Sequence, residues 1–153
     1  FGQTSDAVIR VVVPAGHCGP ALRARLEFDG PDGPAKVAVA DAAAVAAPGS
    51  PDALEGLVQF HRLRFTELAA DVLALAGPGG EGLDAAARAV QAFSASLGAD
   101  EPRVRALKQD ADSQVCEAVS RRDWYTSWGA HYLRSLARAH LTQQCNNFKD
   151  PGV

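Results

Sequence analysis

A cysteine and a histidine stand side by side near the start of the chain, where a thiol nucleophile could be built. Cys18 follows His17, and Gly16 and Gly19 flank the pair. In a cysteine nucleophile, a neighbouring imidazole takes the thiol proton and a third group orients the imidazole. Residues adjacent in sequence do not face each other across space in this way, and we recognise no partner acid. We therefore interpret this segment as a loop after a strand.

His61 is a second residue with chemical potential. Val58 and Phe65 lie about one turn away on either side, so the imidazole falls on the apolar stripe of a predicted helix. A buried histidine can be a proton switch or a metal ligand. Buried polar groups, however, normally find hydrogen-bond partners within the fold, and we interpret His61 as a structural residue.

Neither a metal site nor a phosphate site is predicted. His131, His140 and Cys145 do not share one helix face, and no Cys-x-x-Cys pair occurs. Residues 77–82 are rich in glycine, but they follow a predicted helix instead of a strand and lack the Lys-Ser/Thr pair of a phosphate loop. We predict no catalytic residue, no metal and no cofactor, and therefore a protein that is not an enzyme.

Aromatic residues concentrate in the last predicted helix and its tail. Both tryptophans and both tyrosines of the chain lie there. Large aromatic rings dominate the energetics of cores and interfaces, so this element is predicted to anchor either the fold or a partner. The predicted anchor residues are Trp124, Tyr125, Trp128, Tyr132 and Phe148.

The same helix has a mild basic bias, which raises the possibility of nucleic-acid binding. Aromatic rings beside cations can stack the bases of a single strand. The net charge of −3 argues against this reading, because nucleic-acid binders normally present a basic face. We treat nucleic-acid binding as a weaker alternative, and the cations concerned are Arg121, Arg122, Arg134, Arg138 and Lys149.

The first third of the chain, residues 1–49, is predicted to be β-structure. Residues 7–13 are rich in β-branched side chains and stop at Pro14, and residues 22–28 alternate apolar and charged side chains. A dense turn signal at 29–34 joins the second of these strands to a third at 36–40. Three strands do not readily make a complete sandwich, so we expect the rest of the sheet to lie in a neighbouring domain.

Residues 50–153 are predicted to form an antiparallel four-helix bundle followed by a loop. Ser50 is a good N-cap, the glycines from Gly77 and at Gly98 end the first two helices, and Asp100 caps the third. The fold class is thus α+β, with a short antiparallel sheet element before the bundle. The inward stripes are expected to include Leu54, Leu75, Val104, Leu107, Ala111, Val115, Val119, Trp124, Trp128, Tyr132, Leu136 and Ala139, with Leu133 and Leu141 beside the last stripe.

The composition of the chain limits where in the cell we expect the protein to be found. No run approaches the roughly 18 apolar residues of a membrane span. The odd count of three cysteines favours a reducing compartment, so we expect an intracellular, cytoplasmic location. The chain has no methionine, from which we expect a processed product or a piece of a longer protein.

Both ends of the chain resemble a known family. The strings are Trp128-Gly129-x-His131-Tyr132-Leu133-Arg134-Ser135-Leu136, Gln144-Cys145-Asn146-Asn147-Phe148-Lys149-Asp150-Pro151-Gly152-Val153 and the opening Phe1-Gly2-Gln3-Thr4-Ser5-Asp6. They resemble the region after the von Willebrand factor A (VWA) domain in eukaryotic intracellular proteins that often carry a hedgehog-intein-like (Hint) domain and sometimes a U-box or RING finger. The resemblance implies a sheet portion near a VWA domain, then a helical bundle. It places no catalytic residue in this chain, because neither the VWA metal motif nor the Hint nucleophile motif is present.

The sequence therefore predicts a non-catalytic interaction or scaffolding module of a larger VWA-type protein. Its partners would be other proteins or a neighbouring domain of the same polypeptide, with no membrane. An accessory, substrate-positioning region of a ubiquitin ligase is the rival reading.

Overall fold

A computed structural model describes residues 7–9, 11–19, 22–30, 33–42, 47, 49–98 and 100–143. The chain divides into two compact units. One is the hairpin unit, Ile9–Ala53, and the other is the helical unit, which comprises Leu54–Val153 together with Phe1–Val8. The predicted α+β class is confirmed, since a two-stranded antiparallel sheet precedes the helices.

The sheet is a hairpin of β1 (Leu22–Gly30) and β2 (Gly33–Ala42), as predicted from the alternation and the turn signal. Its register pairs Leu22 with Ala42 and Arg25 with Val39, and an irregularity falls between Phe28 and Gly30. Because side chains alternate across a strand, Leu22, Ala24 and Leu26 share one face. Arg23, Arg25 and Glu27 share the other, where Arg25 and Glu27 form an ion pair at 2.6 Å.

The predicted first strand is wrong. Within residues 7–13, the described positions 7–9 and 11–13 belong to no strand. The segment after them turns at once, since the His17 amide donates to the Pro14 carbonyl at 3.2 Å and Gly16 has a φ of +83°. β-Branched residues favour a strand only where a neighbouring strand pairs with them, and composition alone could not show that no such pairing forms here.

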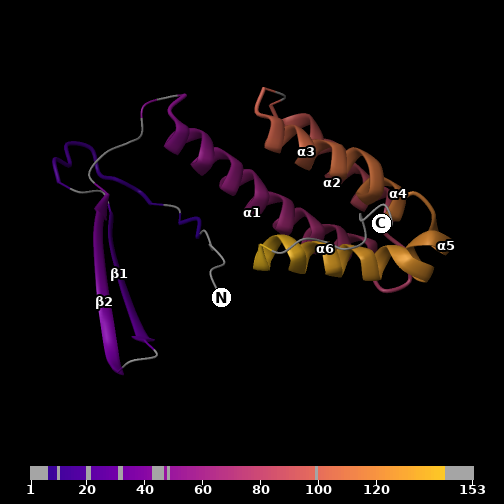
Figure 1. Ribbon diagram of the computed structural model, residues 1–153. Coiled ribbons are helices and arrows are strands. Elements are labelled where there is room, and N and C mark those ends of the chain that lie inside the picture. The colour runs from indigo at the N-terminus through magenta and orange to yellow at the C-terminus, as the bar shows by residue number, and fades with distance from the viewer. Residues whose placement is uncertain are drawn as a thin grey trace. The chain divides into compact units, whose positions relative to one another are not determined.

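The described residues of the helical unit form four rods (Figure 1). The first is α1 (Pro51–Ala76) and the second α2 (Leu83–Ser96). The third runs from α3 (Pro102–Asp110) through a π-helical segment, η1 (Ala111–Val115), into α4 (Cys116–Ala118). The fourth runs from α5 (Arg122–Trp124) through a second π-helical segment, η2 (Tyr125–Gly129), into α6 (Ala130–Thr142).

The helix ends follow the predicted caps in part. The Ser50 hydroxyl accepts the Ala53 amide at 3.2 Å, and Gly77, with a φ of +70°, ends α1. The third rod is capped by Glu101 and not by the predicted Asp100, because the Glu101 carboxylate accepts the Arg103 amide at 3.2 Å. Helix α2 ends in extended backbone at Leu97, so Gly98 is not needed for a left-handed turn.

One core joins the four rods. The predicted inward residues of the third rod are all buried, which confirms that stripe. Two leucines expected inside, Leu54 and Leu75, are exposed instead, and Leu141, expected beside the last stripe, is also exposed. The core side chains are Val58, Phe65, Leu68, Val72, Ala76, Ala86, Val90, Phe93, Leu97, Val104, Leu107, Ala111, Val115, Ala118, Val119, Tyr125, Tyr132, Leu133 and Leu136.

The third and fourth rods touch at backbone distance. A Cβ placed on Gly129 would lie 2.4 Å from the Ala118 carbonyl oxygen, and the next nearest atoms are also Ala118 backbone. Such a distance is far inside van der Waals contact, so only glycine fits here.

No helix among the described residues has the length and apolar character that crossing a bilayer requires.

Candidate functional site

The aromatic residues of the fourth rod occupy different depths. Tyr125 is 1 % exposed and is among the largest fully buried side chains of the described residues. Tyr132 is also buried, and Trp128 is partly buried and packs against the core. The rings of Trp128 and Tyr132 meet edge to face with centroids 5.8 Å apart, a favourable geometry for aromatic pairs. Three of the predicted anchor residues therefore contribute to the helical core.

Tyr132 combines burial with a directed hydrogen bond. Its hydroxyl donates to Gln114 Oε1 at 2.6 Å, which links the fourth rod to η1. Burial, with a smaller contribution from the charge of Asp110, raises the pKa of Tyr132 to about 12. The phenol is thus held neutral, as an apolar body with one satisfied polar end.

Trp124 lies at the edge of the bundle, outside the core cluster. The guanidinium of Arg121 stands 4.8 Å from the centre of its ring, within cation–π range. Arg121 also forms an ion pair with Asp123 at 2.6 Å, and Arg122 donates to the Gly79 carbonyl at 2.7 Å. Arg121 and Arg122 thus have partners within the chain, and the nucleic-acid alternative stays a prediction. The remaining predicted anchor, Phe148, lies outside the described residues.

The candidate residues for acid–base chemistry belong to different units of the chain. His17 and Cys18 lie in the hairpin unit and are exposed, and the Cys18 thiol is 3.3 Å from the Gly16 carbonyl oxygen. His61 lies on α1 in the helical unit, where burial and then the charge of Arg64 lower the pKa of its imidazole. Within the part of the chain that the structure describes, no three His, Cys, Asp or Glu side chains group as metal ligands would.

Sequence reasoning missed a polar cluster between the second and third rods. The buried Ser94 hydroxyl donates to Asp112 Oδ1 at 2.5 Å, and the Lys108 ammonium donates to the Ser94 hydroxyl at 2.5 Å and to Asp112 Oδ2 at 3.0 Å. The hydrogen bond from Ser94, and then that from Lys108, lowers the pKa of Asp112. The four-residue spacing of Lys108 and Asp112 was the available signal.

A serine beside a lysine also suggests a nucleophile and its base. The geometry here favours a structural role instead, in which the cluster connects two helices. Ser94 is only 4 % exposed, so a substrate could not reach it without opening the bundle. Its proton is directed to Asp112, and a carboxylate with a lowered pKa is a weak base. The cluster therefore ties η1 to α2 through charge-assisted hydrogen bonds.

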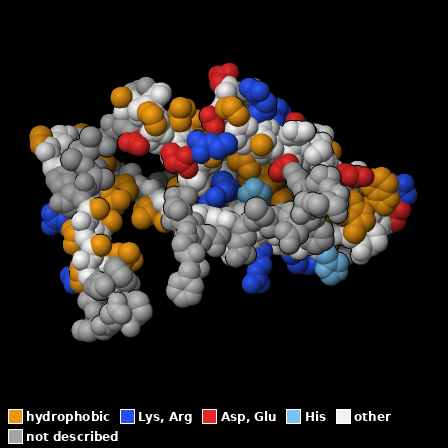
Figure 2. Space-filling view, viewed as in Figure 1, with side chains coloured by type: hydrophobic (Ala, Val, Ile, Leu, Met, Phe, Trp, Pro, Cys, Tyr) orange, Lys and Arg blue, Asp and Glu red, His pale blue; other side chains and the backbone are white. Residues whose placement is uncertain are grey.

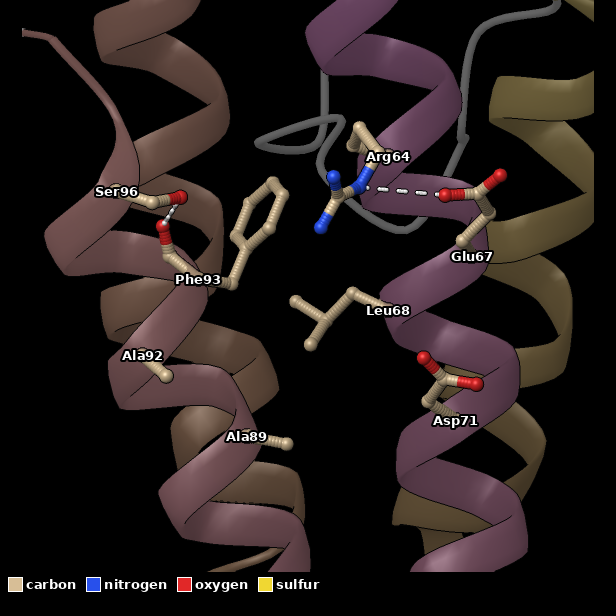
Figure 3. A pocket seen from close by; sticks show the side chains of 8 residues that line it. All are labelled: Arg64, Glu67, Leu68, Asp71, Ala89, Ala92, Phe93 and Ser96. Atoms are coloured by element: carbon tan, nitrogen blue, oxygen red, sulfur yellow. Dashed lines mark hydrogen bonds and ion pairs between the residues drawn. The ribbon is translucent and has the colours of Figure 1, made fainter.

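The surface of the helical unit has one hollow between its first two rods and another between α1 and the start of the third rod. One, of about 330 Å³, lies between Arg64, Glu67, Leu68 and Asp71 of α1 and Ala89, Ala92, Phe93 and Ser96 of α2. Figure 3 shows Leu68 and Phe93 pointing toward each other across this hollow. The other, of about 380 Å³, is lined by Leu54, Leu57, His61, Gly98, Asp100, Glu101 and Val104.

Comparison with known proteins gives one family match. A family model described as "Vwaint: VWA / Hh protein intein-like" matches residues 101–153, which are the last third of the chain. The match supports a VWA-associated, Hint-like region there and is consistent with a domain of a larger VWA-type protein. The curated proteins gave no match. The solved structures gave none either. The resemblance of the opening residues, and the U-box or RING context, stay predictions.

Proposed function

We propose that this chain is a non-catalytic interaction module of a larger VWA-type protein and that its hairpin joins a sheet of a neighbouring domain. The observation that carries the proposal is the exposed apolar surface of the hairpin. Leu22, 37 % exposed, and Leu26, 60 % exposed, lie on one face, and Val37, 50 % exposed, and Val39, 59 % exposed, lie on the other face with Arg25 and Glu27. Because a lone two-stranded hairpin is at best marginally stable in water, such a surface supports completion by further strands.

The two strands differ in a way that indicates where the sheet would grow. β1 carries Arg23, Arg25 and Glu27 on one face, and charges of this kind protect an edge strand from pairing. From Val37 to Ala40, β2 is apolar on both faces, which is typical of an inner strand buried on both sides. We infer that the free edge of β2 accepts the next strand.

Hydrogen–deuterium exchange tests the proposal directly. In the isolated chain, amides of residues 22–42 should exchange rapidly, while those of the buried α1 segment 58–72 should be protected. In the longer parent protein, the hairpin amides should become protected and the α1 amides should not change. Equal hairpin protection in both samples would contradict the proposal.

A pair of variants tests whether the protection depends on the face of β1 that carries Leu22, Ala24 and Leu26, which we call the apolar face. Leu26→Lys in the parent protein should restore rapid exchange in the hairpin, because a cation would be placed on the face that becomes buried. Arg23→Lys is the matched control, since it keeps the charge on the opposite face. It should leave the protection unchanged. If both variants behave alike, the apolar face is not the docking face.

A further inference from the structure

The two hollows on the helical unit lie one after the other along α1, and we call them together the seam groove. Glu67 belongs to the α1 wall of this groove. The other positions of that wall are Leu54, Leu57, His61, Arg64, Leu68 and Asp71. These positions follow steps of 3, 4, 3, 4 and 3 residues, so they form a single stripe on one helix face. At 1.5 Å per residue the stripe is about 26 Å long. The opposite wall is α2 and the segment that follows it.

The floor of the seam groove is apolar and partly open to solvent. Leu54 is 36 % exposed and Leu57 43 % exposed, although both lie beside the core residue Val104. Further along, the small side chains Ala89 and Ala92 leave space next to Phe93. Leucines at helical spacing, beside small residues on the facing helix, are the lining that an added helix requires.

The rim of the groove is acidic. It carries Glu67, Asp71, Asp100 and Glu101, and among the described residues that line it Arg64 is the one Lys or Arg. Figure 2 shows acidic and hydrophobic side chains next to each other where α1 begins.

Part of this charge is already paired. Arg64 pairs with Glu67 at 3.3 Å. Outside the groove, Arg103 binds Glu101 at 2.8 Å and also Glu55. Within the described residues, neither Asp71 nor Asp100 has an ion-pair partner. Two exposed carboxylates, one in each hollow, are thus available to a cationic partner.

We propose that the seam groove binds an amphipathic, basic α-helix of a partner protein. Leucine-like side chains spaced by three and four residues would enter the hollows, and flanking Lys or Arg side chains would meet Asp71 and Asp100. This is helix-in-groove recognition, in which an apolar face gives affinity and charge complementarity gives orientation. A second copy of this chain that meets the first groove to groove fits less well, because the two rims have the same sign of charge. The proposal is independent of the hairpin, which lies in the other unit.

The probe for the test is a fluorescent synthetic helix of about 18 residues, the length that matches the groove. One version has a leucine stripe flanked by lysines, and the other has glutamate in place of every lysine. Fluorescence anisotropy with the complete chain should show binding of the lysine version and at least tenfold weaker binding of the glutamate version. Equal binding of the two versions would overturn the charge argument.

Matched variants locate the binding surface. Asp71→Asn with Asp100→Asn should weaken binding about fivefold, since each exposed charge pair contributes modestly. The control is Asp84→Asn with Glu117→Gln, which removes the same charge from exposed positions that line neither hollow and should leave affinity unchanged. If the two double variants bind equally, the peptide is not in the groove.

A third variant tests the apolar floor. Leu57→Gln should weaken binding about tenfold, as loss of an apolar anchor does at a hot spot. The residue is already exposed, so the thermal midpoint should hardly change. Unchanged affinity in this variant would refute the groove. Sedimentation of the chain alone at the same concentrations should show a monomer, and a dimer that Leu57→Gln dissociates would show that a second copy is the occupant.

Discussion

The contact between Gly129 and Ala118 allows a sharp test of the packing between the third and fourth rods. In a Gly129→Ala variant the new Cβ would lie 2.4 Å from the Ala118 carbonyl oxygen, so the two rods must separate. Overpacking against rigid backbone costs about 3 kcal/mol at the upper end of its usual range. Alanine is intrinsically better than glycine in a helix by about 1 kcal/mol. We therefore expect the free energy of unfolding to fall by about 2 kcal/mol.

The assay is a thermal melt followed by circular dichroism. For a unit of this size, a loss of about 2 kcal/mol should lower the midpoint by roughly 10 °C. Gly56→Ala is the matched control, because Gly56 lies inside α1 and its added Cβ would meet nothing within 4 Å. That control should gain about 0.5–1 kcal/mol and melt higher. If Gly129→Ala melts as high as the wild type, the close approach of the rods is wrong.

Two further outcomes concern the aromatic residues of the fourth rod. Tyr125→Ala should lower the free energy of unfolding in urea by about 3–5 kcal/mol, because the ring is fully buried. Trp124→Ala, at the edge of the bundle, should lower it by about 1 kcal/mol. Similar losses in the two variants would contradict the assigned depths. Tyr132 has a pKa raised to about 12 in the folded state against 10.0 as a free side chain, so its contribution to stability is complete below pH 10 and is lost as the pH rises through about 12. Urea unfolding across this pH range should show a steeper decline in the wild type than in Tyr132→Phe, and parallel declines would refute the shift.

The general architecture was predictable because local signals agreed with tertiary packing. The alternation at 22–28 and the turn residues that follow it predicted the hairpin, and steps of three and four residues predicted the rods. The first strand failed because a β-branched run does not specify its pairing partner. The prediction that Leu54 and Leu75 are buried was wrong, because periodicity shows which face of a helix is apolar but not how far the neighbouring helix extends.

The site was predictable only in part. Concentration of the aromatic residues predicted that the fourth rod anchors either the fold or a partner, but it could not rank the burial of Tyr125 above that of Trp124. The Ser94 cluster and the seam groove both depend on which helices become neighbours, and a single sequence does not specify this. The π segment of the third rod, in contrast, did have a signal in the sequence. The core residues Leu107, Ala111, Val115 and Val119 of that rod follow one another at steps of four. In a regular α-helix each such step overshoots a full turn by about 40°, so a wider π turn keeps these residues on one side.

That wider turn has a consequence for how related chains would differ from this one. A π segment is equivalent to one extra residue accommodated inside a helix, with the hydrogen-bond ladder resuming on either side. Loss of one residue within η1 or η2 would restore an ordinary turn and leave the side chains beyond it facing the same way, whereas loss of a residue from a regular α-helical stretch would rotate everything beyond it by about 100°. Single-residue gaps in an alignment of relatives are therefore expected inside these two rods, paired with compensating changes in side-chain size at Ala118 and Gly129.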